Sequence, residues 1–385
     1  MPDTPKHREL SRRLRADIAA GRYAAEGKLP SEPQLVKQFG VSRPTVARAL
    51  LDLQNEGLIE RRAGSGTYLR RTTGAAVNST RQLGLLIPGL GNTEVFERVC
   101  GELASLSRVH EYSLLWGGST HPGQDTDASL EHAEELCGHF IDRRVSGVFF
   151  APYELVPEKE SANRRLAETL RQAGIPVVLL DRDLQSFPNR SDFDLVGIDN
   201  VAGGYLLAEH LIKLGCRHIC FVARPLSAPT VDARIAGVRE ALVRRQLDAG
   251  PRWLRVGDPA DVKFARSLTA AKQADAFICA NDHTAAQLLR SLEACGVKVP
   301  RDVRVVGFDD VKYATLLAVP LTTIHQPCRD IAVIALRAML ERIADPTLPA
   351  RSLALTPRLV VRESCGAYLP RPASSLLVSN RSKTK

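Results

Sequence analysis

The chain has 385 residues and a formal net charge of +9. This length exceeds what one ordinary hydrophobic core accommodates, so we expect two or three domains. No uninterrupted apolar stretch approaches the roughly 20 residues of a membrane span, and no apolar run follows a basic N-terminus as in a signal peptide. The sequence therefore predicts a cytoplasmic protein without membrane association.

The positive charge lies at the two ends of the chain. Residues 1–72 contain 14 basic and 8 acidic residues, residues 366–385 contain 4 basic and no acidic residues, and the segment between them has a net charge of −1. A basic small domain joined to a near-neutral large one is typical of nucleic-acid binding by the small domain alone. The final segment, 366–385, lacks an apolar period, and we predict a disordered basic tail.

The N-terminal segment has the pattern of a helix-turn-helix. Ser31 is a favourable N-cap for a helix over residues 31–38, and Gly40 ends that helix. Ser42 is the N-cap of a second helix, whose first turn tolerates Pro44 because no N–H is needed there. Apolar residues at three- and four-residue spacing predict the buried face of this second helix: Val46, Ala49, Leu50 and Leu53.

A glycine-tipped strand pair follows the second helix, over residues 59–62 and 67–69. Such a wing, together with the free N-terminal end of the second helix, presents basic and small polar residues to base edges and phosphates. The predicted DNA contacts are Ser31, Ser42, Arg43, Pro44, Thr45, Arg48, Arg61, Arg62, Gly64, Ser65 and Gly66. A winged helix-turn-helix is therefore the predicted fold of the first domain.

Three segments, LPSE, FGVSRPTVARAL and GLIERRAGSGTYL, resemble the DNA-binding domain of GntR-family transcription regulators over about residues 6–70. The segment 7–21, with apolar residues at helical spacing, is similar to that family's first helix. Pro33 and Ala47 stand where the family commonly has arginines that contact DNA, so the family's operator cannot be transferred to this chain. The resemblance implies double-stranded operator DNA as a partner.

Residues 72–82 are small and polar, and we predict a flexible linker between a domain over 1–71 and one over 83–365. In the second domain, short apolar runs alternate with helical stretches, which indicates an α/β fold with parallel sheets. The runs are 83–87, 113–115, 147–150, 177–180, 196–198, 218–222, 253–256, 276–280, 303–307 and 322–324. Their number exceeds one comfortable sheet and favours two lobes, joined near residues 199 and 326.

Polar side chains directly follow several of these strands. Asp181 and Arg182 follow VVLL, and Asp199 and Asn200 follow VGI. Asn281 and Asp282 follow FICA, Asp309 and Asp310 follow VVGF, and Gln326 follows TTIH. Ligand-binding groups of parallel α/β sheets gather beyond the carboxyl ends of the strands, so these residues are candidate ligand contacts. Asn281 and Asp309 have a simpler alternative role as caps of helices or turns. Arg234 begins a predicted helix, where the helix dipole disfavours a cation, and this favours a ligand role.

Four motifs in order resemble the ligand-binding domain of LacI/GalR regulators over about residues 82–365: VGIDNVAGGYLLAEHLIKLGCRHICFV, ARIAGVREAL, FICANDHTAAQLLRSLEACGVKVPRDVRVVGFDD and LTTIHQP. That family has the fold of periplasmic sugar-binding proteins, with the ligand in a cleft between two lobes. The resemblance implies ligand contacts at Asp181, Arg234, Asn281, Asp309 and Gln326. We expect Val95, Phe96 and Trp253 to belong to the core rather than to the walls of the cleft.

The two resemblances together are similar to the arabinose-responsive repressors of Gram-positive bacteria. They imply a bacterial homodimer that associates with the nucleoid when it binds its operator, and a small effector that controls operator affinity. A sugar is the expected effector. The sequence leaves open a pentose, a hexose, a disaccharide or a purine, and it does not say whether the effector releases DNA or promotes binding.

Motifs for catalysis or metal binding are not found. The sequence has no G-x-S-x-G elbow, no H-E-x-x-H and no phosphate-binding loop, and its nine histidines do not cluster. The eight cysteines lack zinc-ligand spacing and predict reduced thiols. We therefore expect no enzyme activity, metal or cofactor. Two alternatives are a sugar- or nucleotide-processing α/β enzyme with an autoregulatory DNA-binding domain, and an architectural DNA-binding protein without a ligand.

Overall fold

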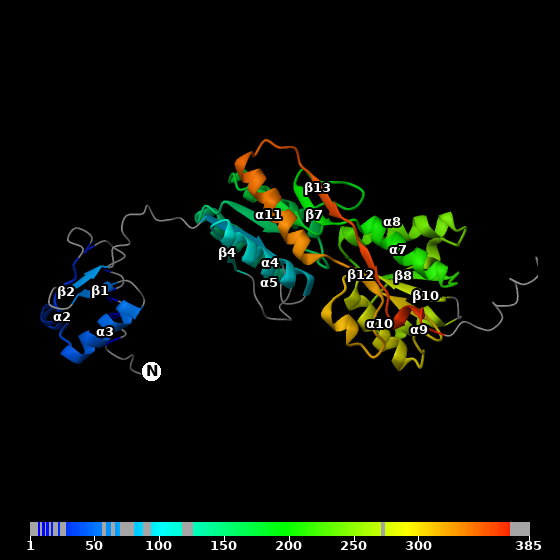
Figure 1. Cartoon of the computed structure of the whole chain (residues 1–385), viewed down its shortest axis with the longest axis horizontal. Coiled ribbons are helices and arrows are strands. Elements are labelled where there is room, and N and C mark those ends of the chain that lie inside the picture. Colours follow the sequence, from blue (N-terminus) through cyan, green and yellow to red (C-terminus); the bar gives the residue numbers. More distant parts are fainter. Residues whose placement is uncertain are drawn as a thin grey trace, which may run out of the picture. The chain divides into compact units, whose positions relative to one another are not determined.

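The chain divides into two compact units, Met1–Ser79 and Thr80–Lys385. No described helix is long and apolar enough to cross a membrane. Figure 1 shows the elements of each unit. The computed structural model describes, apart from isolated residues before residue 28, residues 28–55, 59–62, 66–69, 81–87, 94–117, 126–270 and 274–369.

From residue 28 on, the described part of the first unit has the helices α2 (Glu32–Phe39) and α3 (Arg43–Asn55) and the antiparallel strand pair β1 (Ile59–Arg62) and β2 (Gly66–Leu69). Gly40 ends α2 in the left-handed conformation and donates its N–H to the carbonyl oxygen of Val36. The predicted apolar face of α3 is confirmed, because four residues on it are fully buried: Val46, Ala49, Leu50 and Leu53. Leu10 and Leu14 belong to the same core. The remainder of the predicted helix over 7–21 falls largely outside the described residues.

The second unit contains two lobes, and the first lobe is built on a six-stranded parallel sheet with the order β13-β7-β6-β5-β3-β4. Its strands are β3 (Arg81–Leu86), β4 (Tyr112–Trp116), β5 (Gly147–Phe150), β6 (Val177–Leu180), β7 (Asp194–Ile198) and β13 (Ser352–Leu355). The helices of this lobe are α4 (Glu94–Val109), α5 (Thr126–Asp142), α6 (Lys159–Gln172) and α11 (Cys328–Ala344). Parallel strands covered by helices on their faces are typical of an α/β fold.

The second lobe is built on a four-stranded parallel sheet with the order β11-β10-β8-β9. Its strands are β8 (Ile219–Ala223), β9 (Leu254–Val256), β10 (Ala276–Cys279) and β11 (Arg304–Val306). Its helices are α7 (Asn200–Lys213), α8 (Pro229–Arg244), α9 (Val262–Thr269) and α10 (Asp282–Ala294). Three short 3₁₀ helices are η2 (Pro251–Trp253), η3 (Lys312–Thr315) and η4 (Glu363–Cys365).

The chain passes between the lobes at more than the two predicted places. It crosses near residue 199, between β7 and α7, and near residue 326, between β12 (Thr323–His325) and α11. It crosses again between β13 of the large sheet and β14 (Arg358–Val360), which pairs with β12 antiparallel. The sequence analysis missed this last crossing because it did not predict β13 and β14.

Two predicted boundaries are wrong by a few residues. The strand β3 begins at Arg81, inside the predicted linker 72–82, because Arg81 and Gln82 pair with β4 and the carbonyl oxygen of Gln82 accepts the N–H of Ser146 at 2.7 Å. At the other end, residues 366–369 form a turn in which Leu369 donates its N–H to the carbonyl oxygen of Gly366 at 3.1 Å. The rest of the predicted tail, 370–385, lies outside the described residues.

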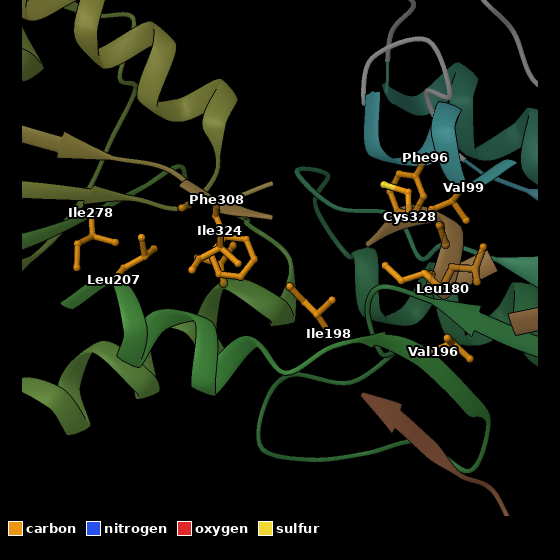
Figure 2. Packing of buried hydrophobic residues seen from close by; sticks show 14 of the residues in the cluster. Phe96, Val99, Leu180, Val196, Ile198, Leu207, Ile278, Phe308, Ile324 and Cys328 are labelled. Carbon is orange, nitrogen blue, oxygen red and sulfur yellow. The ribbon is translucent and has the colours of Figure 1, made fainter. Parts of the chain in front are cut away.

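One hydrophobic core runs through both lobes of the second unit. Figure 2 shows Leu180 and Val196 in the first lobe, Phe308 and Ile324 in the second, and Ile198 between the two groups. All five side chains are buried. Because well-packed interiors shift between discrete arrangements rather than deforming continuously, this core constrains how the lobes can move.

The helices α7 and α8 approach each other closely. A side-chain carbon at Gly237 would lie 1.9 Å from the carbonyl oxygen of Val201, and one at Gly204 would lie 2.1 Å from the carbonyl oxygen of Arg234. No side chain fits at either position without moving the backbone, so glycine is required there. This contact sets the position of Arg234 relative to α7.

Candidate ligand cleft and DNA-binding surface

A cleft lies in the second unit, lined by residues from both lobes. Its lining includes every residue that the sequence predicted as a ligand contact: Asp181, Arg234, Asn281, Asp309 and Gln326. These residues follow β6, β10, β11 and β12 or lie on α8. Asp181, Asn281 and Asp309 follow parallel strands, so the carboxyl ends of these strands bring together side chains that are up to 128 residues apart in the sequence.

The cleft also contains residues that the family resemblance did not imply as ligand contacts: Glu94, Val95, Phe96, Glu154, Arg182, Thr230, Val231, His283, Val311 and Tyr313. Phe96 is buried in the core as expected and Val95 packs against that core, and both also line the cleft because α4 begins at Glu94 and its first turn borders it. Trp253 is a core residue, as expected, and its ring lies edge-on to that of Phe221 with the ring centres 6.4 Å apart. Glu154 and Arg182 follow the parallel strands β5 and β6, so both lie beyond the carboxyl ends of strands, where ligand contacts were expected.

Arg234 is buried to 4% exposure and held by three neighbours. Its Nε donates to Asn200 at 2.8 Å, its Nη1 donates to the carbonyl oxygen of Ala280 at 2.6 Å, and its guanidinium lies 3.6 Å from the centre of the Phe308 ring. The helix α8 begins at Pro229, so Arg234 lies in the second turn and does not begin the helix as predicted. The helix dipole therefore gives no reason to assign Arg234 to a ligand, and its contacts with Asn200, Ala280 and Phe308 explain the position of its side chain.

Asp309 lies between Arg234 and Gln326. Gln326 donates through Nε2 to Oδ1 of Asp309 at 2.7 Å, and Nη2 of Arg234 lies 3.9 Å from the same oxygen. Burial raises the pKa of Asp309 to about 6, since the favourable charge of Arg234 does not fully offset the loss of water. A carboxyl group with a pKa displaced in this direction is typical of a functional site.

Three buried atoms of the cleft have no hydrogen-bond partner within the described part of the chain: Oδ1 of Asp181, Nε of Arg182 and Oε1 of Gln326. Buried polar atoms are normally paired, because leaving one unpaired costs about 1–3 kcal/mol. Burial also raises the pKa of Asp181, despite its neighbour Arg182. These atoms are available to a ligand that offers both hydrogen-bond donors and acceptors.

Arg182 and Glu154 form an ion pair at the side of the cleft. Nη1 of Arg182 lies 2.5 Å from Oε1 of Glu154, and the guanidinium lies 5.3 Å from the centre of the Phe96 ring. Burial opposes the ionisation of Glu154, but Arg182 and the N–H of Ala228 outweigh it and lower the pKa of Glu154. The pair is therefore ionised at neutral pH.

Asn281 has the simpler role that the sequence left open. It is the N-cap of α10, and its Oδ1 accepts the N–H of Thr284 at 2.8 Å. A capping side-chain oxygen still has a neighbouring amide nitrogen with two donors. Asn281 can therefore cap the helix and present its amide to the cleft.

In the first unit, the N-terminal end of α3 is open to solvent. The side chain of Arg43 is 77% exposed, and its Nε lies 3.4 Å from Oε2 of Glu32 on α2. The hydroxyl groups of Ser42 and Thr45 lie 2.8 Å apart, and Pro44 and Arg48 are exposed. These residues form a continuous polar end of the helix, as expected for a recognition helix.

The wing is described only in part. Gly66 is exposed at the start of β2, and Lys28 lies with its Nζ 5.2 Å from the centre of the Tyr68 ring. On the N-cap of α2, Ser31 donates its N–H to Oε1 of Gln34 at 2.8 Å. The predicted contacts Gly64 and Ser65, and the side chains of Arg61 and Arg62, lie outside the described residues.

Comparison with known protein families decides the classification of both units. The model of bacterial regulatory proteins of the gntR family matches residues 6–69, and that of the periplasmic binding protein-like domain matches residues 208–365. The chain belongs to the GntR-type regulators with a periplasmic-binding-protein-like domain. The HTH-type transcriptional repressor PurR of Vibrio parahaemolyticus is 30% identical over 74% of this chain and 82% of its own length. The arabinose metabolism transcriptional repressor of Geobacillus stearothermophilus is 28% identical over 94% of this GntR-type chain and 97% of its own length.

Solved structures of similar proteins have the same fold. The transcriptional regulator CelR in complex with cellobiose is 24% identical, with a TM-score of 0.63 over 87% of this regulator and 100% of that chain. A GntR transcription regulator from Chromobacterium violaceum is 26% identical, with a TM-score of 0.57 over 74% of this chain and 99% of its own. The expected fold class, a winged helix-turn-helix joined to a two-lobed α/β domain, is confirmed.

The thiols and carboxylates of the regulator do not form a metal centre in the part of the chain that the structure describes. All eight cysteines are free, and six of them are buried. Burial raises the pKa of several of these thiols, such as Cys100 and Cys279. Buried thiols with raised pKa values are poor nucleophiles, so they serve as small core residues.

Proposed function

We propose that this protein represses transcription by binding operator DNA through its first unit, and that a sugar bound in the cleft of the second unit changes its affinity for the operator. The grouping of the predicted ligand residues in one cleft, with buried atoms left unpaired, is the observation that supports this proposal best. Relatives named for arabinose metabolism and for the ribose operon of Escherichia coli support a sugar as the ligand.

The charges of the cleft favour a neutral ligand. Four carboxylates line it and only two guanidinium groups: Glu94, Glu154, Asp181 and Asp309, with Arg182 and Arg234. Burial and the nearby Arg224 lower the pKa of His283, so this residue adds no positive charge at neutral pH. Excess negative charge in a buried site repels phosphates and carboxylates. Hydroxyl groups donate to carboxylates and accept from guanidinium groups, and charged partners strengthen these hydrogen bonds.

A regulator fits this cleft better than an enzyme does. The described lining has no serine, cysteine or lysine, and its carboxylates Glu154 and Asp309 are already held by Arg182 and Gln326. Its aromatic and aliphatic residues, such as Phe96 and Val311, suit the faces of a sugar ring. The first unit supplies the polar N-terminal end of α3. We therefore propose binding without turnover as the function of the cleft.

We propose a homodimer as the functional form. One winged helix covers a small part of an operator, and two copies on half-sites a helical turn or multiples apart supply the affinity that one copy lacks. Operator DNA as the partner would place the protein on the nucleoid in the bacterial cytoplasm.

A thermal-shift screen of the full chain against neutral sugars, sugar phosphates and nucleobases tests the proposal. A ligand at 100 times its Kd stabilises a protein by about 2.7 kcal/mol, which is easily measured. We expect a neutral sugar to raise the melting temperature of the parent protein and not that of Arg234→Ala. The same sugar should change the operator affinity in a gel-shift assay. Stabilisation by a sugar phosphate alone would contradict the assignment of a neutral ligand.

A further inference from the structure

A short segment of the first lobe contacts a turn of the second lobe at the edge of the cleft. Leu155 donates its N–H to the carbonyl oxygen of Leu226 at 2.9 Å. Nζ of Lys159 donates to the same carbonyl oxygen at 2.8 Å and to that of Ser227. Oε2 of Glu154 accepts the N–H of Ala228 at 3.2 Å. Residues 154–159 and 226–228 are therefore joined by hydrogen bonds that two separated lobes could not make.

The second of these segments is the N-terminal end of α8. Its N-cap is Ala228, whose side chain cannot accept a hydrogen bond, and Pro229 follows at the first helical position. Helix N-terminal N–H groups need acceptors, and a carboxylate there interacts favourably with the helix dipole. Glu154 supplies that carboxylate from the opposite lobe. The cap of α8 is thus complete only when the lobes are closed.

The other oxygen of Glu154 connects this cap to the cleft. Oε1 pairs with Nη1 of Arg182 at 2.5 Å, and Nε of Arg182 is buried without a hydrogen-bond partner in the described part of the chain. A ligand that accepts a hydrogen bond from Nε would fix the guanidinium, and the guanidinium in turn orients Glu154 toward Ala228. The helix that Glu154 caps carries Arg234.

We infer that Glu154 and Lys159 form an interlobe clasp, in which Glu154 is a positioning residue that couples ligand binding at Arg182 to closure of the lobes on the N-terminal end of α8. This inference rests on the proposed function, because it assigns the closure step of the same cleft. Lys159 does not line the cleft, so it contacts no ligand there, and its effect comes through the clasp and through its charge on Glu154 and Arg182. A ligand shifts a two-state equilibrium only through its different affinities for the two states, and the clasp contributes to the state with the higher affinity.

Hydrogen exchange of the unliganded full chain tests the clasp directly. In the parent, the amides of Leu155 and Ala228 are hydrogen-bonded across the lobes. We expect peptides that contain these amides to exchange several-fold faster in Glu154→Gln and in Lys159→Met. Lys159→Arg keeps a cation and its donors and should restore most of the protection. The matched control is Glu134→Gln, which removes a carboxylate paired with Arg165 at 3.5 Å on the exposed surface of the same lobe.

A second experiment measures the affinity of each variant for a neutral sugar that stabilises the parent in the thermal-shift screen. Coupling free energies of typical size predict that Lys159→Met weakens its binding by roughly 5- to 150-fold. Exchange rates in both variants equal to those of Glu134→Gln would overturn the clasp, and so would unchanged sugar affinity in Lys159→Met. If no sugar stabilises the parent, the proposed function fails, while the exchange experiment still decides whether the clasp exists. Lys159→Met carries the test by itself if Glu154→Gln does not fold.

Discussion

Replacing the buried carboxylate of Asp309 by an amide should remove the ligand response and make the second unit more stable at neutral pH. The carboxyl group accepts from Gln326 at 2.7 Å and lies 3.9 Å from Arg234. Asparagine keeps the size of the side chain and an oxygen that accepts from Gln326. It loses the charge that strengthens a hydrogen bond to a ligand hydroxyl. We therefore expect Asp309→Asn to lose sugar binding by calorimetry and to keep operator binding without sugar.

The stability gain follows from the pKa of the carboxyl group. Burial raises it from 3.8 to about 6, a difference that corresponds to roughly 3 kcal/mol at most at 1.36 kcal/mol per unit. In the pH range between these values the folded protein binds more protons than the unfolded chain, so the stability of the parent falls as pH rises. The charge of Asp309 also raises the pKa of the buried Asp282, and its removal relieves that repulsion.

Calorimetric unfolding of the full chain at several pH values measures this gain in stability as a shift in the melting temperature of the second unit. The variant should exceed the parent in melting temperature above about pH 6, and the difference should shrink as pH falls toward 4. Asp330→Asn is the control, since it removes an exposed carboxylate from the first turn of α11. A variant that is less stable than the parent at pH 7.5, or a difference independent of pH, would refute the reasoning.

Three further predictions concern the DNA-binding unit, the packing of α7 against α8 and the oligomeric state. Arg43→Ala should weaken operator binding by about 1–3 kcal/mol and relax preference at one base pair, whereas Arg61→Ala should weaken all sequences alike and flatten the salt dependence. Gel shifts with operator and random DNA distinguish a base contact from a phosphate contact. An equal loss of affinity for both DNAs in Arg43→Ala would show that Arg43 does not contact a base. Gly237→Ala should destabilise the second unit by about 1–3 kcal/mol, because its new carbon would lie 1.9 Å from the carbonyl oxygen of Val201. Gly101→Ala, on a helix position with no atom within 4 Å, should be neutral or stabilising in the same denaturation assay. Sedimentation of the full chain should show a dimer at micromolar concentration, and a monomer at tens of micromolar would contradict the proposed assembly.

The elements that the sequence predicted well are those that local physics determines. Buried parallel strands are short apolar runs, and all ten predicted runs contain a strand. The turn of the helix-turn-helix depends on one glycine in the left-handed conformation, and Gly40 has a φ of 62°. The strand β13 was missed because its residues alternate between exposed and half-buried, and its pairing partner β7 lies about 150 residues earlier in the chain. Such a strand is specified by its neighbour rather than by its own pattern.

The same distinction separates the predicted and missed residues of the cleft. Asp181, Asn281 and Asp309 were predicted because each follows a strand of one sheet or the other, and sheet topology brings those ends together. Tyr313 and Glu94 were not, because their place in the cleft depends on how the lobes close. Both oxygens of Glu94 accept the N–H of Lys312, at 2.8 and 2.7 Å, and this contact joins α4 of one lobe to η3 of the other. No local pattern encodes a contact between segments 218 residues apart.

Hydrogen bonds between the lobes therefore stabilise the closed state, whereas the unpaired polar atoms buried in the cleft destabilise it. Glu94 and Lys159 join the lobes through backbone groups, which any sequence at 226–228 or 312 offers, while Asp181 and Gln326 keep buried oxygens unpaired. The first effect favours the closed state without ligand, and the second opposes it by about 1–3 kcal/mol for each unpaired atom. Because the two effects oppose each other, a ligand that pairs those atoms removes the opposing one and raises the population of the closed state. A cleft with all of its polar atoms already paired would lack this contribution to the difference in ligand affinity between the open and closed states.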